Sequence, residues 1–203
     1  MERFTITANQ YLNKDTVAFY HMEYVPVKST GQLSFINYFK NTYGTETESN
    51  LDFATKELKI VLLRDLPEIL RLLKFVMMTV CIVPRAKADA NYRRNQLLFK
   101  TTTSIVAKSI PGINDGGGYI TRHTNTKTTH LPIRTPNYVN DGLLPYPGIT
   151  KATCEISNSV VGKDILLVDD IYTNNRNIDE DAIQALLDAG ATSVTFYAIG
   201  KTS

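Results

Sequence analysis

The clearest pattern of apolar and polar positions lies near the C-terminus. The continuous apolar run 165–168 (Ile-Leu-Leu-Val) predicts a short buried strand that ends at Asp169 and Asp170. After a polar stretch, apolar residues between 178 and 187 recur at spacings of three and four, which predicts a helix. Residues 194–199 predict the next strand, so this part of the chain indicates a strand–helix–strand unit with a right-handed crossover.

Three apolar patterns upstream predict further helices, over residues 33–40, 51–73 and 93–110. The second pattern contains Pro67, which cannot donate a backbone hydrogen bond and is expected to break the helix. Asp65 precedes this proline by two positions and fits an N-cap at which the helix restarts.

Two more segments predict strands. Residues 75–83 are apolar except for Thr79, a composition that suits a central parallel strand buried on both faces. Residues 17–20 (Val-Ala-Phe-Tyr) predict another strand. Strands that alternate with helices indicate an α/β fold with a Rossmann-like parallel sheet flanked by helices.

The distribution of polar residues suggests how the chain is organised. Residues 1–55 are polar with scattered aromatic side chains, and we expect an irregular N-terminal hood or appendage there. Residues 56–203 would form the core, although a single domain overall is equally compatible with this length. Within the core, residues 112–150 are rich in glycine, proline and threonine and are too long for an ordinary connection. We therefore expect a mobile loop, with Gly116–Gly118 as its hinge.

Composition excludes several classes of protein. The 203 residues carry a net charge of +2, so bulk charge does not indicate a protein that coats nucleic acid. The only cysteines, Cys81 and Cys154, lie far apart, which excludes a zinc ribbon and a disulfide framework. The longest apolar run has nine residues, about half the length of a membrane-spanning helix. Without a secretion signal at the N-terminus, we expect a cytoplasmic protein with no membrane partner.

The most informative polar residues are the acidic pair Asp169 and Asp170. In an open parallel sheet, ligands bind beyond the carboxyl ends of the strands, where this pair is predicted to lie. Adjacent carboxylates repel each other unless a diol, a hydrated metal ion or backbone amides compensate. The start of the following helix would suit a phosphate, so a phosphorylated sugar fits this pattern. A solvated strand end, with Asp170 capping a turn, is the structural alternative.

The run from Ile165 to Thr173 (Ile-Leu-Leu-Val-Asp-Asp-Ile-Tyr-Thr) resembles the phosphoribosyl-pyrophosphate (PRPP) signature of type I phosphoribosyltransferases. Upstream, Ile82–Arg85 and Arg93–Leu98 are similar to the ComF-like, amidophosphoribosyltransferase-like branch of that family. Arg122–Thr129 lies where this branch has a mobile loop rich in arginine and threonine. The resemblance covers residues 75–200 and leaves the first sixty residues without a match.

The resemblance implies a fold, a reaction and a set of site residues. The fold would be that of the type I phosphoribosyltransferases, and the reaction would move ribose 5-phosphate from PRPP to a nucleobase or an amine with release of pyrophosphate. Asp169 and Asp170 would hold the ribose 2′- and 3′-hydroxyls, and Mg²⁺ would bridge pyrophosphate and ribose oxygens while keeping most of its waters. The implied phosphate-binding residues are Thr173, Asn174, Asn175, Arg176 and Asn177 for the 5-phosphate, and Pro84, Arg85, Arg93, Arg122 and Lys127 for the pyrophosphate.

The phosphate loop departs from the family pattern. The family has Thr-Gly-x-Thr where this chain has Asn174–Asn177. Asn175 is the residue type that best replaces glycine at positive φ, and Asn177 could cap the helix with Glu180 as its capping-box partner. The acids at 179–181 suit the helix dipole, but they compete with a bound anion. The alternative is therefore a catalytically degenerate protein that binds a nucleotide or PRPP as a regulatory or complex-forming subunit.

Other partners remain open at this stage. A homodimer or a complex with another protein is compatible with the sequence. Arg93 and Arg94 could contact a nucleic-acid backbone, in which case binding would depend strongly on salt, but the acidic pair favours a phosphorylated ribose ligand.

Overall fold

The fold is built on a six-stranded, mostly parallel sheet with the strand order β1-β2-β8-β7-β3-β4. The computed structural model describes residues 1–25, 33–128, 140, 142, 149, 152–174 and 176–202. Within these residues β1 runs antiparallel to β2, and the other neighbouring strands are parallel. The strands of this sheet are β1 Glu2–Ile6, β2 Thr16–Glu23, β3 Met78–Ile82, β4 Ile113–Asp115, β7 Asp164–Tyr172 and β8 Ser193–Lys201.

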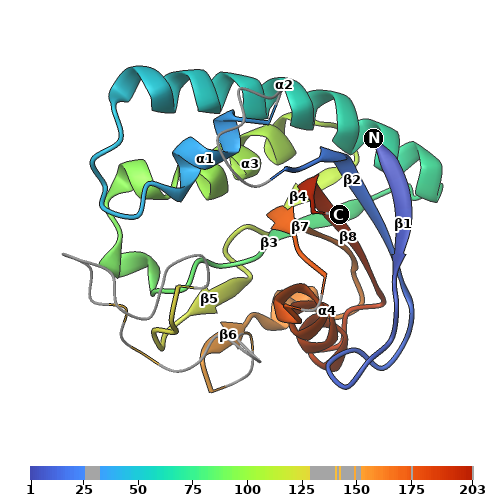
Figure 1. Cartoon of the computed structure of the whole chain (residues 1–203). Helices are drawn as coiled ribbons and strands as arrows, with labels where there is room; N and C mark the ends of the chain where they lie inside the picture. Colours follow the sequence, from blue (N-terminus) through green and yellow to red (C-terminus); the bar gives the residue numbers. More distant parts are fainter. Residues whose placement is uncertain are drawn as a thin grey trace.

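Helices cover both faces of the sheet (Figure 1). On one face lie α1 (Phe35–Lys40), α2 (Glu48–Leu73) and α3 (Leu98–Ser109), and on the other lies α4 (Ile178–Asp188). No helix in the described part of the chain is long and apolar enough to span a bilayer. The predicted class, an α/β protein with a mostly parallel, helix-flanked sheet, is confirmed.

Alternate residues of the central strands enter two separate cores. Leu166 and Val168 of β7 pack with the side chains of α1, α2 and α3, whereas Ile165 and Leu167 pack with those of α4. All four are at most 1% exposed. Because side chains of a strand alternate between faces, a strand covered on both sides is apolar throughout. This burial explains the continuous apolar run in the sequence.

The N-terminal residues belong to the sheet, so an irregular hood over residues 1–25 is wrong. The strand predicted at 17–20 is confirmed within β2, which pairs in parallel with β8 through Ala18 and Phe196, while β1 adds an antiparallel edge. Phe19 and Tyr20 are buried on opposite faces of this strand. Strand β1 was not predicted, because only Ile6 of its five residues is buried.

Helix α2 continues through Pro67, contrary to the predicted break. Pro67 is exposed, and Leu63, whose carbonyl loses its usual partner four residues later, is 51% exposed. Water can therefore satisfy that carbonyl. On its opposite side the helix buries Leu62, Leu66 and Ile69, each at 0% exposure, and this packing outweighs the local cost of proline.

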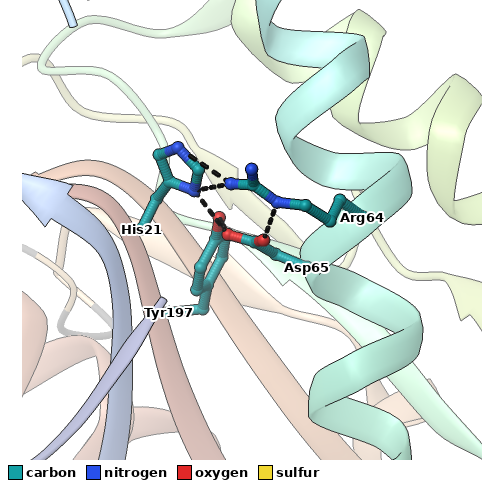
Figure 2. A network of polar contacts seen from close by, with 4 residues as sticks. All are labelled: His21, Arg64, Asp65 and Tyr197. Atoms are coloured by element: carbon teal, nitrogen blue, oxygen red, sulfur yellow. Dashed lines mark hydrogen bonds and ion pairs between the residues drawn. The ribbon is translucent and has the colours of Figure 1, made fainter. Parts of the chain in front are cut away.

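Asp65 is a buried anchor of α2 and does not cap a helix (Figure 2). Its carboxylate accepts hydrogen bonds from the Tyr197 hydroxyl of β8 at 2.8 Å and from Arg64 Nε at 2.9 Å. Nδ1 of His21 in β2 lies 2.7 Å from the same carboxylate. Burial acts to raise the pKa of Asp65, but the hydrogen bonds from His21, Arg64 and Tyr197 outweigh it and lower the pKa below its usual value. The network ties α2 to two strands of the sheet.

The segment predicted as a mobile loop begins with regular structure. Residues 113–115 form β4 in the main sheet, and β5 (Ile120–Arg122) pairs antiparallel with β6 (Cys154–Ile156). Most of the remaining loop, residues 129–151, lies outside the described residues. The loop prediction is therefore wrong for residues 113–115 and 120–122, whereas residues 116–119 lie in a turn between these strands.

Candidate functional site

A cavity of about 520 Å³ lies at the carboxyl ends of the parallel strands. Its lining includes Tyr24 after β2, Pro84 after β3, Thr173 after β7 and Thr202 after β8. Strands β3 and β7 are neighbours in the sheet. From β3 the chain crosses to β4 on one side of this pair, and from β7 it crosses to β8 on the other side. The cavity thus lies at a topological switch point, which is where open α/β sheets bind their ligands.

Most of the residues predicted for the site line this one cavity. They come from three distant parts of the sequence: Pro84, Arg85, Arg122, Lys127, Asp169, Asp170, Thr173 and Arg176. Asn174, Asn177 and Arg93 do not line it, and Asn175 lies outside the described residues. Arg93 is exposed and donates a 3.4 Å hydrogen bond to the Gly44 carbonyl, so its place at the site stays a prediction.

Asp169 and Asp170 reach the cavity from opposite faces of the sheet. Strand β7 continues past them to Tyr172, and Asp169 pairs with Ala198 of β8. By the alternation of β7, Asp169 faces α4, where it hydrogen-bonds the Asp179 side chain. Asp170 faces the side of α1, where Lys40 and Arg85 oppose the effect of burial on its pKa. A strand that ended at residue 168, as predicted, would have placed the two carboxylates side by side. Because β7 continues past them, they lie on opposite faces of the sheet instead.

The hydrogen bond between Asp169 and Asp179 joins two buried carboxyl groups. Burial raises the pKa of Asp179 to about 8, and burial together with the charges of Asp179 and Asp170 raises the pKa of Asp169 well above its usual range. A hydrogen bond between two carboxyl groups requires a proton on one of them. Burial thus favours the protonated form of both carboxyl groups.

The whole first turn of α4 is acidic and buried. Asp179, Glu180 and Asp181 are 4%, 2% and 9% exposed. The Tyr172 hydroxyl donates to Glu180 Oε1 at 2.9 Å, and the Ile149 backbone N–H donates to Asp181 Oδ2 at 2.6 Å. These acids suit the positive end of the helix dipole, as the sequence predicted. Their burial was not predicted, because it depends on segments far away in the sequence.

Asn177 begins α4 without the predicted capping box. It adopts φ +60°, and its side chain makes no cap hydrogen bond. Instead, its Oδ1 accepts a 3.0 Å hydrogen bond from Asn9 Nδ2 in the loop between β1 and β2. Asparagine tolerates this left-handed conformation. The positive φ predicted at Asn175 lies outside the described residues.

Arg85 holds together chain segments that line the cavity. Its guanidinium donates to the carbonyls of Phe39 at 2.7 Å, Gln96 at 2.8 Å and Lys40 at 2.5 Å. The group also lies over the Tyr92 ring, 4.7 Å from the ring centroid. These bonds use three of the five guanidinium N–H groups, so much of its hydrogen-bonding capacity supports the fold around the site.

Further cations add positive charge to the lining of the cavity. Arg122 is 4% exposed, its Nε donates 2.6 Å to the Arg85 carbonyl, and burial lowers its pKa. Lys127 and Arg176 also line the cavity. Lys100 does so as well, but it forms a 2.5 Å ion pair with Asp89. Such a lining attracts an anionic ligand.

Several lining residues were not predicted as site residues. Asp179 and Lys40 carry charge, and Tyr24, Phe39 and Phe99 give the cavity an aromatic side. Lys40 Nζ donates a 3.1 Å hydrogen bond to the Tyr24 hydroxyl. Tyr24 follows β2, Phe39 and Lys40 belong to α1, and Phe99 and Asp179 lie near the starts of α3 and α4. Their convergence depends on the order of the strands, which a single sequence does not reveal.

No protein-family model matches the chain, and no curated protein matches it. The site must therefore be interpreted from its own geometry. Its lining combines acidic side chains of β7 and α4 with cationic and aromatic side chains. Such a combination can bind an anionic ligand that also offers hydroxyl donors and a planar or apolar portion.

Proposed function

We propose that this protein is a PRPP-dependent phosphoribosyltransferase with the type I fold, of the ComF-like, amidophosphoribosyltransferase-like branch. It would transfer ribose 5-phosphate to a nucleobase or an amine and release pyrophosphate. The observation that carries the proposal is the convergence of Asp169 and Asp170 with Arg122, Lys127 and Arg176 around one cavity at the switch point. The resemblance of residues 165–173 to the PRPP signature supports it independently.

The cavity has suitable dimensions and polarity for such a ligand. Its volume of about 520 Å³ lies within the range of small-molecule and cofactor sites. Asp170 and the Asp169–Asp179 pair would accept hydrogen bonds from ribose hydroxyls. Thr173 and Arg176 would face the 5-phosphate, and Lys127 and Arg122 would face the pyrophosphate beside the turn at Pro84. The aromatic side of the cavity would receive the acceptor.

Mg²⁺ fits this donor set only as an ion that enters with the ligand. Among the residues that the structure describes, no group of three or more histidine, cysteine or acidic side chains could hold a metal ion. Mg²⁺ commonly binds through one or two carboxylates together with substrate phosphates and water, and Asp169 and Asp170 are the carboxylates placed to take part. When bound, the ion would neutralise charge on the leaving pyrophosphate.

The protein's own contribution to the reaction would be mainly electrostatic. Displacement at the anomeric carbon develops positive charge on the ribose ring and negative charge on the leaving pyrophosphate. The carboxylates of Asp169 and Asp170 would stabilise the first, and Arg122 and Lys127 would stabilise the second. Arg85 would act as a positioning residue, because it holds the segments that carry Lys40 and Gln96 around the ligand.

A release assay tests this function. The protein is incubated with PRPP and Mg²⁺, a panel of nucleobases and amines is added, and pyrophosphate is measured. We expect at least one acceptor to stimulate release, and we expect Asp170→Asn to slow it by about 100-fold, as for other lost electrostatic contacts. Asp188→Asn, an exposed change at the end of α4, serves as the matched control. Release at equal rates in wild type and Asp170→Asn would reject the assignment.

A second candidate is a catalytically degenerate protein that binds PRPP or a nucleotide as a regulatory or complex-forming subunit. Two observations favour it: Arg85 gives three N–H groups to backbone carbonyls, and the Asn177 side chain bonds Asn9. This alternative predicts saturable binding of PRPP with no pyrophosphate release for any acceptor in the panel.

A further inference from the structure

A stripe of exposed apolar side chains runs along the outer face of α2. Phe53, Ile60 and Leu63 are 48%, 52% and 51% exposed, and Pro67 is exposed as well. These residues follow the a and d spacing of a heptad repeat, which places them on one side of the helix. Single exposed apolar residues are ordinary on a protein surface, but an aligned series of them marks an interaction site.

The stripe belongs to a firmly held helix at the edge of the molecule. In Figure 1, α2 runs along the top of the view, with α1 and α3 beneath it. The buried Asp65 carboxylate ties this helix to the sheet through Tyr197 and His21. From Phe53 to Pro67 the stripe extends about 20 Å along the helix axis. A surface held in this way loses little conformational entropy when a partner binds, which favours association.

The charged residues of α2 indicate which partner fits this stripe. Glu48 and Asp52 are exposed near the start of the helix, whereas Arg71 and Lys74 are exposed at its end. Glu68 lies 2.6 Å from Arg71 and offsets part of its charge, and Lys74 adds a further cation. A second copy of α2, running antiparallel, would bring the acidic end of each helix to the basic end of the other. A two-fold axis produces this arrangement, because it places one surface patch against itself.

An antiparallel pair also accounts for the polar groups within the stripe. When Ile60 of one copy lies against Leu63 of the other, Lys56 lies opposite Pro67, because the two helices run in opposite directions. Pro67 lacks an N–H group, so the Leu63 carbonyl on this exposed side has no helical donor. The Lys56 ammonium of the second copy would donate to this carbonyl while its aliphatic stem packs on the stripe. Lys59 is exposed at the edge of the stripe and would stay in water.

We propose that this stripe is the interface of a symmetric homodimer, in which α2 of one copy packs antiparallel against α2 of a second copy. None of the described residues that line the cavity belongs to α2, so the interface leaves both sites open to ligand. The inference therefore goes beyond the proposed function and does not depend on it. One helix from each copy forms an interface smaller than the standard size of about 800 Å² per partner, so we expect a dissociation constant in the micromolar range.

Sedimentation equilibrium of the full chain tests the proposal. Between about 1 and 300 µM, the wild type should pass from the mass of one chain to the mass of two. Ile60→Glu places a carboxylate at the centre of the interface and should weaken the dimer by at least about 100-fold, since an unpaired charge is costly to bury. Ile60 is half exposed, so this variant should keep its fold, which circular dichroism verifies. Val161→Glu is the matched control and should dimerise like wild type, because Val161 is a 59% exposed residue beside Gly190, after the helix on the opposite face of the sheet.

Charge reversal at the two ends of α2 tests the antiparallel arrangement. Glu48→Lys combined with Asp52→Lys makes both ends basic. Arg71→Glu combined with Lys74→Glu makes both ends acidic. Each double variant alone should dimerise at least about tenfold more weakly than wild type, because ends of like charge then meet. An equimolar mixture of the two should recover dimers, since the basic ends of one variant meet the acidic ends of the other. Dimerisation of each double variant alone at the wild-type affinity would overturn the proposal.

Two further results would also overturn the homodimer. One is a wild type that stays monomeric at about 300 µM. If this monomer binds vesicles of anionic phospholipid and Ile60→Glu does not, the stripe is instead a membrane-contacting surface. The other is a dimer of unchanged affinity in Ile60→Glu, which would show that the two copies meet through another surface.

Discussion

The Tyr197 hydroxyl donates a 2.8 Å hydrogen bond to the Asp65 carboxylate, although 132 positions separate the two residues. Tyr197 lies in β8 and is completely buried, and Asp65 lies in α2 at 2% exposure. The bond fixes α2 against the centre of the sheet (Figure 2). Through this contact, the helix layer on that face is held in place over strands whose ends form the cavity.

Tyr197→Phe should destabilise the protein by about 1–3 kcal/mol. The substitution keeps the ring but removes one donor from a buried carboxylate, which loses that hydrogen bond without gaining water. Urea unfolding at pH 7 measures the change in free energy of unfolding. Tyr11→Phe, at a partly exposed position, is the control and should change it by less than about 0.5 kcal/mol. Equal effects of the two changes would show that the Asp65 contact contributes nothing.

Arg85→Lys should weaken both the fold and the site. Lysine cannot reproduce the planar guanidinium that reaches three carbonyls and lies over Tyr92. We expect a loss of about 2 kcal/mol in the free energy of unfolding, since each lost hydrogen bond typically contributes about 1 kcal/mol. Arg94→Lys, at an exposed position nearby, should be nearly neutral. Thermal and urea unfolding of the two variants check this, and equal stability would contradict the positioning role.

The three consecutive glycines give a matched test of packing. Added to Gly116, a Cβ atom would lie 2.8 Å from Thr79 Cγ2 and 3.0 Å from the Val80 carbonyl oxygen, whereas at Gly118 it would meet nothing within 4 Å. Gly116→Ala should therefore cost about 1–3 kcal/mol of stability through overpacking, and Gly118→Ala should cost little. Gly116 and its neighbour Gly117 are buried. If both variants unfold at the same urea concentration as wild type, the close approach of Gly116 to β3 is wrong.

Asp179→Asn should stabilise the unliganded protein in mildly alkaline solution. Burial raises the pKa of Asp179 to about 8, above the usual value of 3.8. A carboxyl group with a raised folded-state pKa favours folding below its unfolded pKa, and that contribution is lost as the pH rises toward the folded value. Titration of Asp179 should thus lower the free energy of unfolding of the wild type by up to about 1.4 kcal/mol per pH unit between these two pKa values.

The measurement is urea unfolding of wild type and Asp179→Asn between pH 5 and pH 9. Because asparagine does not titrate, the difference in stability between the two proteins should shift in favour of the variant as the pH rises. A constant difference across the range would show that Asp179 is not protonated in the folded protein at the acidic end.

The part of the fold that the sequence predicted best is the unit of β7, α4 and β8. Its strands are buried on both faces, so their apolar runs are continuous, and Gly190 adopts φ +98° just past the helix, as its position predicted. The helix break predicted at Pro67 does not occur, because the cost of this proline in α2 is local whereas Leu62, Leu66 and Ile69 gain burial from distant partners. Strand β2 was recognised, but its place beside β8 was not, since strand order depends on contacts between remote segments.

The sequence predicted most charged residues of the candidate site but not the residues that surround them. Asp169 and Asp170 line the cavity, and their place after an apolar run is visible in the sequence. Arg122 and Lys127, which only the family resemblance implied, line it too. The burial of the acids that begin α4 was not predicted for a physical reason. An acid in the first turn of a helix is usually solvated, and the sequence does not reveal that Tyr172 and Ile149 bond Glu180 and Asp181 there.

The central claim is that the acidic end of β7 and the cations around the cavity bind PRPP together. Titration of PRPP with Mg²⁺ into wild type and Asp170→Asn at pH 7 tests it most directly, with Asp188→Asn as the control. We predict saturable binding to one site in wild type and the control, and an affinity at least about tenfold lower in Asp170→Asn, equivalent to about 1.4 kcal/mol. Identical heats for wild type and Asp170→Asn, or no saturable heat in wild type, would contradict the account.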